Sequence, residues 1–209
     1  MYSIRRMADI VSYSAIYSNR ILKEDNLILD LPDFTLDDFL IQAYESLQVN
    51  YPKFYKMDRL SKLGLLASEV IISERPKLNS ASTSVILSNS NASLDTDLRF
   101  WESVKNAASP SLFVYTLPNI VAGEICIRNG FKGESNFFVT PEFDPEWMVY
   151  YVNQILAYEN TEACLAGWVD VLSDHAEVFL YLTLKSGSGI CAHTAENIRK
   201  LYGRISAKS

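Results

Sequence analysis

The chain has 209 residues, which is enough for one domain with a substantial core. It carries 19 basic and 25 acidic side chains, a net charge of −6, and its composition is that of an ordinary globular protein. The overall charge therefore does not favour nucleic acid or an anionic membrane as a partner, and any such binding would need a local basic patch.

The N-terminal segment carries Arg5 and Arg6, but the following MADIVSYSAIY is interrupted by Asp9 and lacks the apolar stretch of a signal peptide. No other stretch reaches the roughly 18 apolar residues of a membrane span. The expected location is therefore the cytoplasm, with no membrane span. Residues 10–17 are rich in strand formers and predict a first strand.

Two helices are expected next. Asp33 or Thr35 is placed to cap a short helix through LDDFLIQAYESL. A longer, core-facing helix ends before Pro76, because apolar residues recur at helical spacing at Met57, Leu60, Leu63, Ala67, Val70 and Ile71.

The middle of the chain alternates strand and helix patterns. TSVILSN, residues 83–89, reads as a buried strand, and SLDTDLRFWESV as a helix. Ser109 and Pro110 are typical of a helix start, and the helix they open is expected to run to Gly130 with a kink at Pro118, since proline removes a backbone donor.

NFFVT, residues 136–140, predicts another strand, and Asp144 with Pro145 starts a helix to about Tyr158. ACLAGWVDVL and EVFLYLTL are two strands joined by the polar turn SDHA, and are expected to pair antiparallel. KSGSG reads as a linker rather than a nucleotide-binding loop, and Thr194 caps a final helix ending near Arg204. The order of elements predicts an α/β fold, with helices packed on one mixed central sheet.

Several strings resemble, in order and spacing, the N-terminal half of beta-ketoacyl synthases (3-oxoacyl-acyl carrier protein synthases) of the thiolase-like superfamily. The most specific is SPSLFVYTLPNIVAGEICIRNGFKGES; YKMDRLSKLGLLASE, ILSNSNASLDTDLRFWESV and CLAGWVDVL support it. The resemblance implies one domain over residues 1–209 with a thiolase-like half-fold, a family-like core at about 55–172 and a C-terminal hairpin and helix at about 173–205. It also implies work on acyl chains carried by acyl carrier protein, and dimerisation through a strand.

In that family the segment after the matching glycine reads approximately GPxxTxxTACA, and its cysteine attacks an acyl thioester. Aligned from Gly133, Thr140 matches the threonine, Pro141 falls on the alanine and Glu142 falls on the cysteine. The resemblance therefore implies that the nucleophile is absent, because a carboxylate is a poor nucleophile toward a thioester. Glu142 is either a solvent-facing acid near a helix start or part of the lining of a vestigial acyl pocket, with proton transfer as a third alternative.

A complete synthase has a second half that supplies two histidines, or a histidine and an asparagine, as oxyanion donors. The sequence ends at Ser209, and neither His175, expected in a turn, nor His193 lies in a string that matches those motifs. Both the nucleophile and the donors that condensation requires are thus expected to be absent.

Two surfaces are candidates for partners. Lys53, Lys56, Arg59 and Lys62 recur every third residue and form either a docking stripe for an acidic carrier protein or simply the solvated side of a helix. The strand Asn136, Phe137, Phe138, Val139 and Thr140 is the expected dimer strand, unless a loop or the C-terminal helix covers it.

Other chemistry has weaker support. Cys126, Cys164 and Cys191 lack metal or disulfide spacing and are expected to be small core residues, and the widely separated histidines predict no metal site and no cofactor. A Ser/His/Asp set using His175 with Asp170 or Asp174 has no support from spacing.

The leading hypothesis is a non-condensing partner or scaffold subunit in fatty acid, aryl polyene or polyketide-type synthesis, as a homodimer or beside an active ketosynthase. One alternative is a thioester-processing enzyme, an acyltransferase-like protein that decarboxylates malonyl groups or hydrolyses or transfers acyl chains and is completed by a second chain. Another is a stand-alone module that binds acyl groups or carrier protein and has an apolar pocket.

Overall fold

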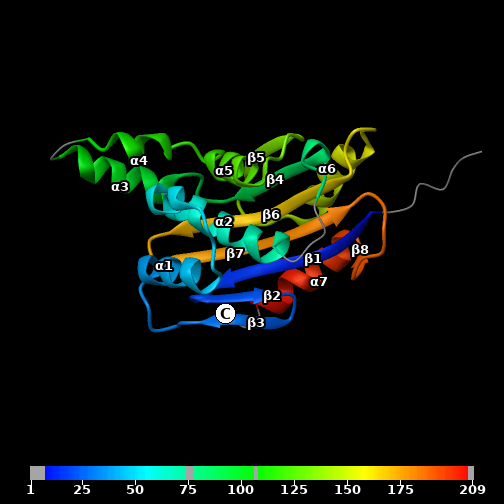
Figure 1. Cartoon of the computed structure of the whole chain (residues 1–209), viewed down its shortest axis with the longest axis horizontal. Coiled ribbons are helices and arrows are strands. Elements are labelled where there is room, and N and C mark those ends of the chain that lie inside the picture. The colour runs from blue at the N-terminus through cyan, green and yellow to red at the C-terminus, as the bar shows by residue number, and fades with distance from the viewer. Residues whose placement is uncertain (1–7, 74–77, 106–107, 207–209) are drawn as a thin grey trace, which may run out of the picture.

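A single mixed sheet organises the computed structural model, which describes residues 8–73, 78–105 and 108–206 (Figure 1). Arg5, Arg6 and the expected helix stop at Pro76 lie outside the described residues. Along the sheet the strands follow the order β3-β2-β1-β7-β6-β4-β5, and β8 pairs with β1. The strands are β1 (Asp9–Tyr17), β2 (Arg20–Lys23), β3 (Asn26–Asp30), β4 (Thr83–Asn89), β5 (Ser135–Val139), β6 (Ala163–Leu172), β7 (His175–Leu184) and β8 (Cys191–Ala192).

Strand directions divide the sheet into two parts. β4 runs parallel to both β5 and β6, whereas β6, β7, β1, β2 and β3 are joined by antiparallel ladders. The central strands are buried on both faces, which explains why β6 reads as a nearly continuous apolar run and why the apolar residues of β4 are consecutive rather than alternating.

Helices cover both faces of the sheet. α2 and α5 pack on one face around Leu87 and Leu165, and α6 and α7 pack on the other around Ile86 and Ala166 (Figure 1). The helical elements are α1 (Leu36–Ser46), the 3-10 turns η1 (Pro52–Lys56) and η2 (Ser80–Ser82), α2 (Arg59–Ile72), α3 (Leu94–Val104), α4 (Pro110–Val114), α5 (Ile120–Asn129), α6 (Pro145–Ala157) and α7 (Ala195–Ser206). Within the described ranges, no helix combines the length and hydrophobicity that a membrane crossing requires.

The predicted helix starts are confirmed by their capping bonds. The side chains of Thr35, Ser109, Asp144 and Thr194 each accept a hydrogen bond from a backbone N–H in the first turn of the helix that follows. Gly130 ends α5 in the left-handed conformation.

Three expectations were wrong in detail. The segment 110–129 is two helices, α4 and α5, rather than one kinked helix, because the chain leaves helical geometry before Pro118 and restarts at Ile120. β2, β3 and β8 were not predicted; β2 and β8 are short, with four and two residues, and β3 is largely exposed, so none of them shows the pattern of a buried strand. His175 begins β7 opposite Leu172 instead of lying in the turn.

The β6–β7 ladder depends on one glycine. Gly167 has φ 146°, and a Cβ at this position would lie 2.0 Å from the carbonyl oxygen of Phe179 on β7. Only glycine permits this close approach of the two backbones in the centre of the sheet.

Candidate functional site

The loop between β5 and α6 is the junction where the alignment places Glu142. The backbone N–H of Thr140 donates to Asn89 O, at the end of the neighbouring β4, over 2.9 Å. The Thr140 hydroxyl donates to the backbone oxygen of Glu142, also over 2.9 Å. These bonds fix the turn, and the Glu142 side chain is exposed to solvent.

The start of α6 is occupied by a different acid. Asp144 Oδ1 accepts from Trp147 N at 3.0 Å, and Glu146 adds a second carboxylate to the first turn. A helix N-terminus stabilises an anion through its unpaired N–H groups, but here a side chain already uses one of them. Asp144, rather than Glu142, is the acid that exploits the helix dipole.

The residue that points inward at this junction is Phe143, which is 7% exposed. Its ring contacts three others, with centroid distances of 4.9 Å to Tyr202, 5.8 Å to Phe179 and 6.1 Å to Trp168. Aromatic rings therefore fill the space beneath the junction. Phe143 was not predicted from the sequence, although an aromatic residue directly before a capping Asp-Pro is a recognisable signal for a side chain that anchors in the core.

His193 is a structural histidine. It is 1% exposed, its Nδ1–H donates to Asn153 Oδ1 at 3.0 Å, and its Nε2 accepts from the Tyr181 hydroxyl at 3.1 Å. Burial lowers its pKa to about 4, so the ring is neutral near pH 7 with both nitrogens satisfied. His175, by contrast, is exposed at the start of β7.

The cysteines carry no activated thiol. Cys164 is fully buried in β6, and burial raises its pKa. Cys126 and Cys191 are partly buried, and burial raises their pKa values too. All three thiols are free, and thiols of raised pKa are weak nucleophiles.

The four basic residues do not lie on one helix. Lys53 and Lys56 belong to the 3-10 turn η1, whereas Arg59 and Lys62 lie in α2. Lys53 Nζ is 2.7 Å from Oε1 of Glu124, which is 4% exposed, while Lys56 is exposed. Lys53 therefore neutralises an internal acid.

Arg59 is held in an internal network. Its guanidinium donates to both carboxylate oxygens of Asp37, at 2.7 and 2.8 Å, and to the backbone oxygen of Ser173 at 2.7 Å. The hydrogen bond from Arg59 lowers the pKa of Asp37. Lys62 is half-buried with its Nζ 5.5 Å from the centroid of the Phe54 ring. Among the four, Lys56 is the cation most open to a partner.

Asp170, near the end of β6, holds a loop rather than a catalytic histidine. Its carboxylate accepts from the backbone N–H groups of Ser90 and Asn91 at 3.2 and 3.0 Å, and from the Asn91 side chain at 2.7 Å. This loop follows β4 and leads into α3. Asp170 thus fixes the base of α3.

β5 is an edge strand of the described sheet, with β4 as its neighbour. On its α6 side, the Phe138 ring contacts the rings of Trp147 and Tyr151 at centroid distances of 4.4 and 5.0 Å, and those two rings stack on each other. Val139 at its end is 56% exposed. Neither α7 nor a described loop pairs with the outer edge of this strand in the sheet, so it is available to a partner strand.

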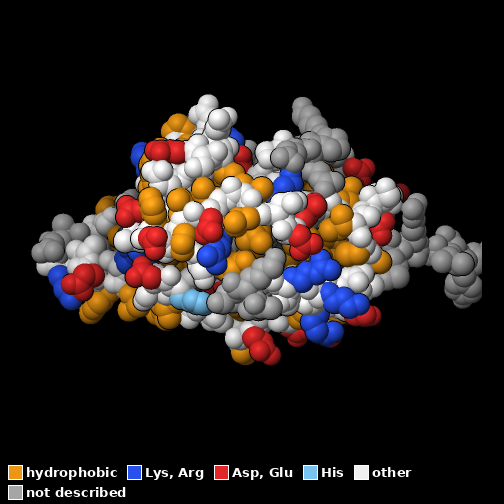
Figure 2. All heavy atoms as spheres, turned by 90° about the horizontal axis from the view of Figure 1, so that it is seen from below, with side chains coloured by type: hydrophobic (Ala, Val, Ile, Leu, Met, Phe, Trp, Pro, Cys, Tyr) orange, Lys and Arg blue, Asp and Glu red, His pale blue; other side chains and the backbone are white. Residues whose placement is uncertain are grey.

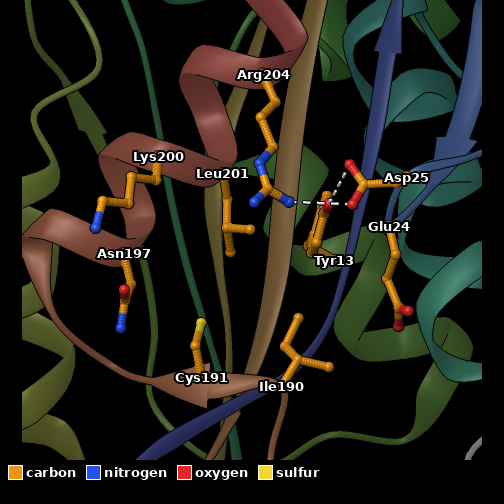
Figure 3. Close-up of a pocket in the computed structure, with 9 residues that line it drawn as sticks. All are labelled: Tyr13, Glu24, Asp25, Ile190, Cys191, Asn197, Lys200, Leu201 and Arg204. Carbon is orange, nitrogen blue, oxygen red and sulfur yellow. Dashed lines mark hydrogen bonds and ion pairs between the residues drawn. The ribbon is translucent and has the colours of Figure 1, made fainter.

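A pocket of about 240 Å³ lies between α7, β8 and the turn joining β2 to β3 (Figure 3). Arg204 pairs with Asp25 at 3.0 Å across it, and the Tyr13 hydroxyl donates to the same carboxylate at 3.3 Å. Burial, together with Asp25, raises the pKa of Tyr13 to about 12. Because Lys200 and Glu24 also line it, this pocket does not offer the apolar wall that an acyl chain needs.

No family model matches the chain, and no curated protein sequence does. Solved structures do match it. The ishigamide ketosynthase/chain length factor aligns with a TM-score of 0.66 and 16% identity, over 88% of this chain and 64% of that one. The chain thus spans just under two thirds of that neighbour's length. A type II polyketide synthase acyl-carrier protein in complex with its ketosynthase bound to the hexaketide (AntDE:AntF) aligns at 0.59 and 13%, over 86% and 63%.

At these identities the likeness establishes the fold: the chain has the thiolase-like fold of ketosynthases, in agreement with the resemblance in the sequence. One neighbour also matches in size. The ketosynthase ApeO in complex with its chain length factor ApeC from Xenorhabdus doucetiae aligns at 0.59 and 10%, over 95% of this chain and 91% of that one. The matched neighbour chain and this chain are therefore of nearly equal length.

Proposed function

We propose that the chain is a non-condensing, ketosynthase-like subunit that acts beside an active ketosynthase in fatty acid, aryl polyene or polyketide-type synthesis. The proposal is supported by the β5–α6 junction, where Glu142, the residue that the alignment puts at the position of the nucleophilic cysteine, is exposed and the following Phe143 is buried. Such a junction holds neither a thiolate nor an open oxyanion site. The subunit would influence product length or act as a scaffold.

The partnership would form through the outer edge of β5. An exposed strand edge presents unpaired N–H and C=O groups and is stabilised when another strand pairs with it. Phe138, Trp147 and Tyr151 form an ordered aromatic wall beside this edge. The size match with the neighbour from a ketosynthase and chain length factor complex supports an active ketosynthase as the partner. Such a complex would work in the cytoplasm.

Acyl carrier protein is a second proposed partner. Of the basic residues put forward for docking it, Lys56 is exposed, whereas Arg59 is engaged with Asp37. Charge reversal at Lys56 would weaken carrier binding if the segment docks an acidic protein, and charge reversal at Lys200, an exposed lysine of α7 on the opposite face of the sheet, serves as the control.

The test of the proposed function is reconstitution. The purified chain receives acyl- and malonyl-carrier protein, alone and together with each ketosynthase found in the same genome. Alone, it should neither accept an acyl group nor form a condensation product; with the ketosynthase, it should change product length or yield. Acyl transfer onto this chain, or condensation by it alone, refutes the proposal.

A single substitution separates a subunit that shapes the product from a thioester-processing enzyme. In the reconstituted pair, Glu142→Ala should leave turnover intact, because an exposed carboxylate at this junction does no chemistry in the proposed role. Glu159→Ala, an exposed acid just beyond the other end of α6, is the matched control. Loss of turnover in the Glu142 variant alone would favour the enzyme.

A further inference from the structure

The pocket between α7, β8 and the β2–β3 turn has two walls of opposite charge (Figure 3). Lys200 and Arg204 form the positive wall, because residues four apart lie on the same side of a helix. Glu24 and Asp25, the two residues of the turn between β2 and β3, form the negative wall. Figure 2, seen from the side where β3 and α7 lie in Figure 1, shows basic side chains gathered right of centre with acidic side chains close by.

The turn is made of residues that its geometry does not favour. Glu24 has φ 57°, in the left-handed region, where a two-residue hairpin turn normally places glycine or asparagine. The Ser12 hydroxyl donates to Glu24 Oε1 at 3.1 Å and orients this carboxylate in the wall of the pocket. A strained backbone that carries a charged side chain into a pocket is typical of a functional site.

The two walls meet in an ion pair that a ligand can open. Arg204 donates to Asp25 Oδ2 at 3.0 Å, and the Tyr13 hydroxyl donates to Oδ1 of the same carboxylate at 3.3 Å. The side chains of Arg204 and Asp25 are 56% and 61% exposed, and ion pairs as solvated as this one are weak. Lys200 forms a similarly exposed pair with Glu196 at 2.6 Å. Both cations can therefore turn toward a ligand at small cost.

The floor between the walls is apolar and short. Leu201, which is 7% exposed, and the buried Tyr13 ring lie beneath the pocket, and Ile190 and Cys191 lie along its lower side (Figure 3). The volume of about 240 Å³ is below the roughly 300 Å³ at which pockets for drug-sized ligands begin. A ligand that fits here is small and has room for one short apolar group.

We infer that this pocket binds a small zwitterion, an α-amino acid with a short apolar side chain. The carboxylate of the ligand lies against Lys200 and Arg204, its ammonium group against Glu24 and Asp25, and its side chain against Leu201. A simple anion or cation is attracted by one wall and repelled by the other, so the pocket selects a ligand that carries both charges. The inference goes beyond the proposed function and is independent of it, because β1, β2 and β3 are separated from β5 by three strands.

The experiment is titration calorimetry of the full chain at pH 7 with L-valine and L-leucine as probes. Isocaproate, which lacks the ammonium group of leucine, and L-leucinamide, which lacks its carboxylate, are the matched analogues. The tighter amino acid should bind with a dissociation constant below about 1 mM, which is within reach of a ligand of about nine non-hydrogen atoms. Each analogue should bind at least about tenfold more weakly than L-leucine, because it loses one charge-assisted contact.

Two arginines of α7 provide a matched pair of variants. Arg204→Gln removes a cation from the pocket, and Arg199→Gln removes one outside it, where Arg199 pairs with Glu146. The side chains in the two ion pairs have the same exposure, 56% for each arginine and 61% for each carboxylate. Arg204→Gln and Asp25→Asn should each weaken amino acid binding at least about tenfold, and Arg199→Gln should change it by less than about twofold. All three variants lose only a surface pair, so they should remain folded by circular dichroism.

Every other result overturns the inference. Binding of isocaproate as tight as that of L-leucine would define an anion site, and equally tight binding of L-leucinamide would define a cation site. No binding of either amino acid up to about 10 mM would mean that the two walls only tie α7 to the β2–β3 turn. Unchanged affinity in Arg204→Gln and Asp25→Asn, or an equal loss in Arg199→Gln, would place the binding elsewhere. None of these results bears on the proposed function, because the ketosynthase is not part of the measurement.

Discussion

Replacing His193 by glutamine tests whether this histidine is a neutral structural residue. The ring is 1% exposed and lies between Asn153 and Tyr181 with a pKa of about 4, below its ordinary value of 6.5. Glutamine also offers one donor and one acceptor there, but it does not titrate.

The direction in which folding stability changes with pH follows from proton linkage. Between pH 6.5 and 4 the unfolded chain binds a proton at His193 and the folded chain does not, so folding stability is present above the unfolded pKa and is lost as the pH falls. Lowering the pH from about 7.5 to about 5 should therefore reduce the free energy of unfolding by about 2 kcal/mol through this residue alone.

The assay is urea unfolding of wild type and His193→Gln at both pH values. Carboxylates common to the two proteins cancel in the comparison. On acidification, the free energy of unfolding should fall by about 2 kcal/mol more in the wild type than in the variant. An equal loss in both proteins would show that His193 is not held neutral by burial, and would reopen a role for it as a charged donor.

Four further outcomes follow from the structure. Asp144→Ala should lower the free energy of unfolding by about 1 kcal/mol because it removes the α6 cap, whereas Glu142→Ala should change it by less than about 0.5 kcal/mol; equal effects in urea unfolding would contradict the assignment of the cap. Phe143→Ala should cost about 3 to 5 kcal/mol by emptying the aromatic cluster, and a cost below about 1 kcal/mol would mean that the ring is not a core anchor. Gly167→Ala should cost about 3 kcal/mol because its Cβ meets Phe179 O, and an unchanged melting temperature would refute that contact. Cys164 should resist Ellman's reagent at pH 8 until the protein unfolds, as mass spectrometry of labelled peptides would reveal; rapid native labelling would contradict its burial.

Capping chemistry made much of the fold predictable. Thr35, Ser109, Asp144 and Thr194 begin their helices as expected, because a side-chain oxygen ahead of a helix satisfies a local backbone donor whatever lies further away. The buried strand at 83–89 matches β4 to the residue, since a β-branched run between polar turns has few alternatives. β2 and β8 were not predictable in this way, because they owe their strand conformation to pairing with β1.

The candidate site was likewise predictable from the sequence only in part. From sequence alone, the segment from Phe138 to Trp147 contains no cysteine, serine or lysine, which determines that no such nucleophile stands at the junction. That Phe143 turns inward, that Asp144 rather than Glu142 caps α6, and that α3 directs its apolar stripe outward were decided only by the tertiary structure. Local patterns specify which residues form a helix, but the direction its faces take depends on contacts between residues far apart in the chain, such as Thr96 with Asp58 and Asp95 with Ser173.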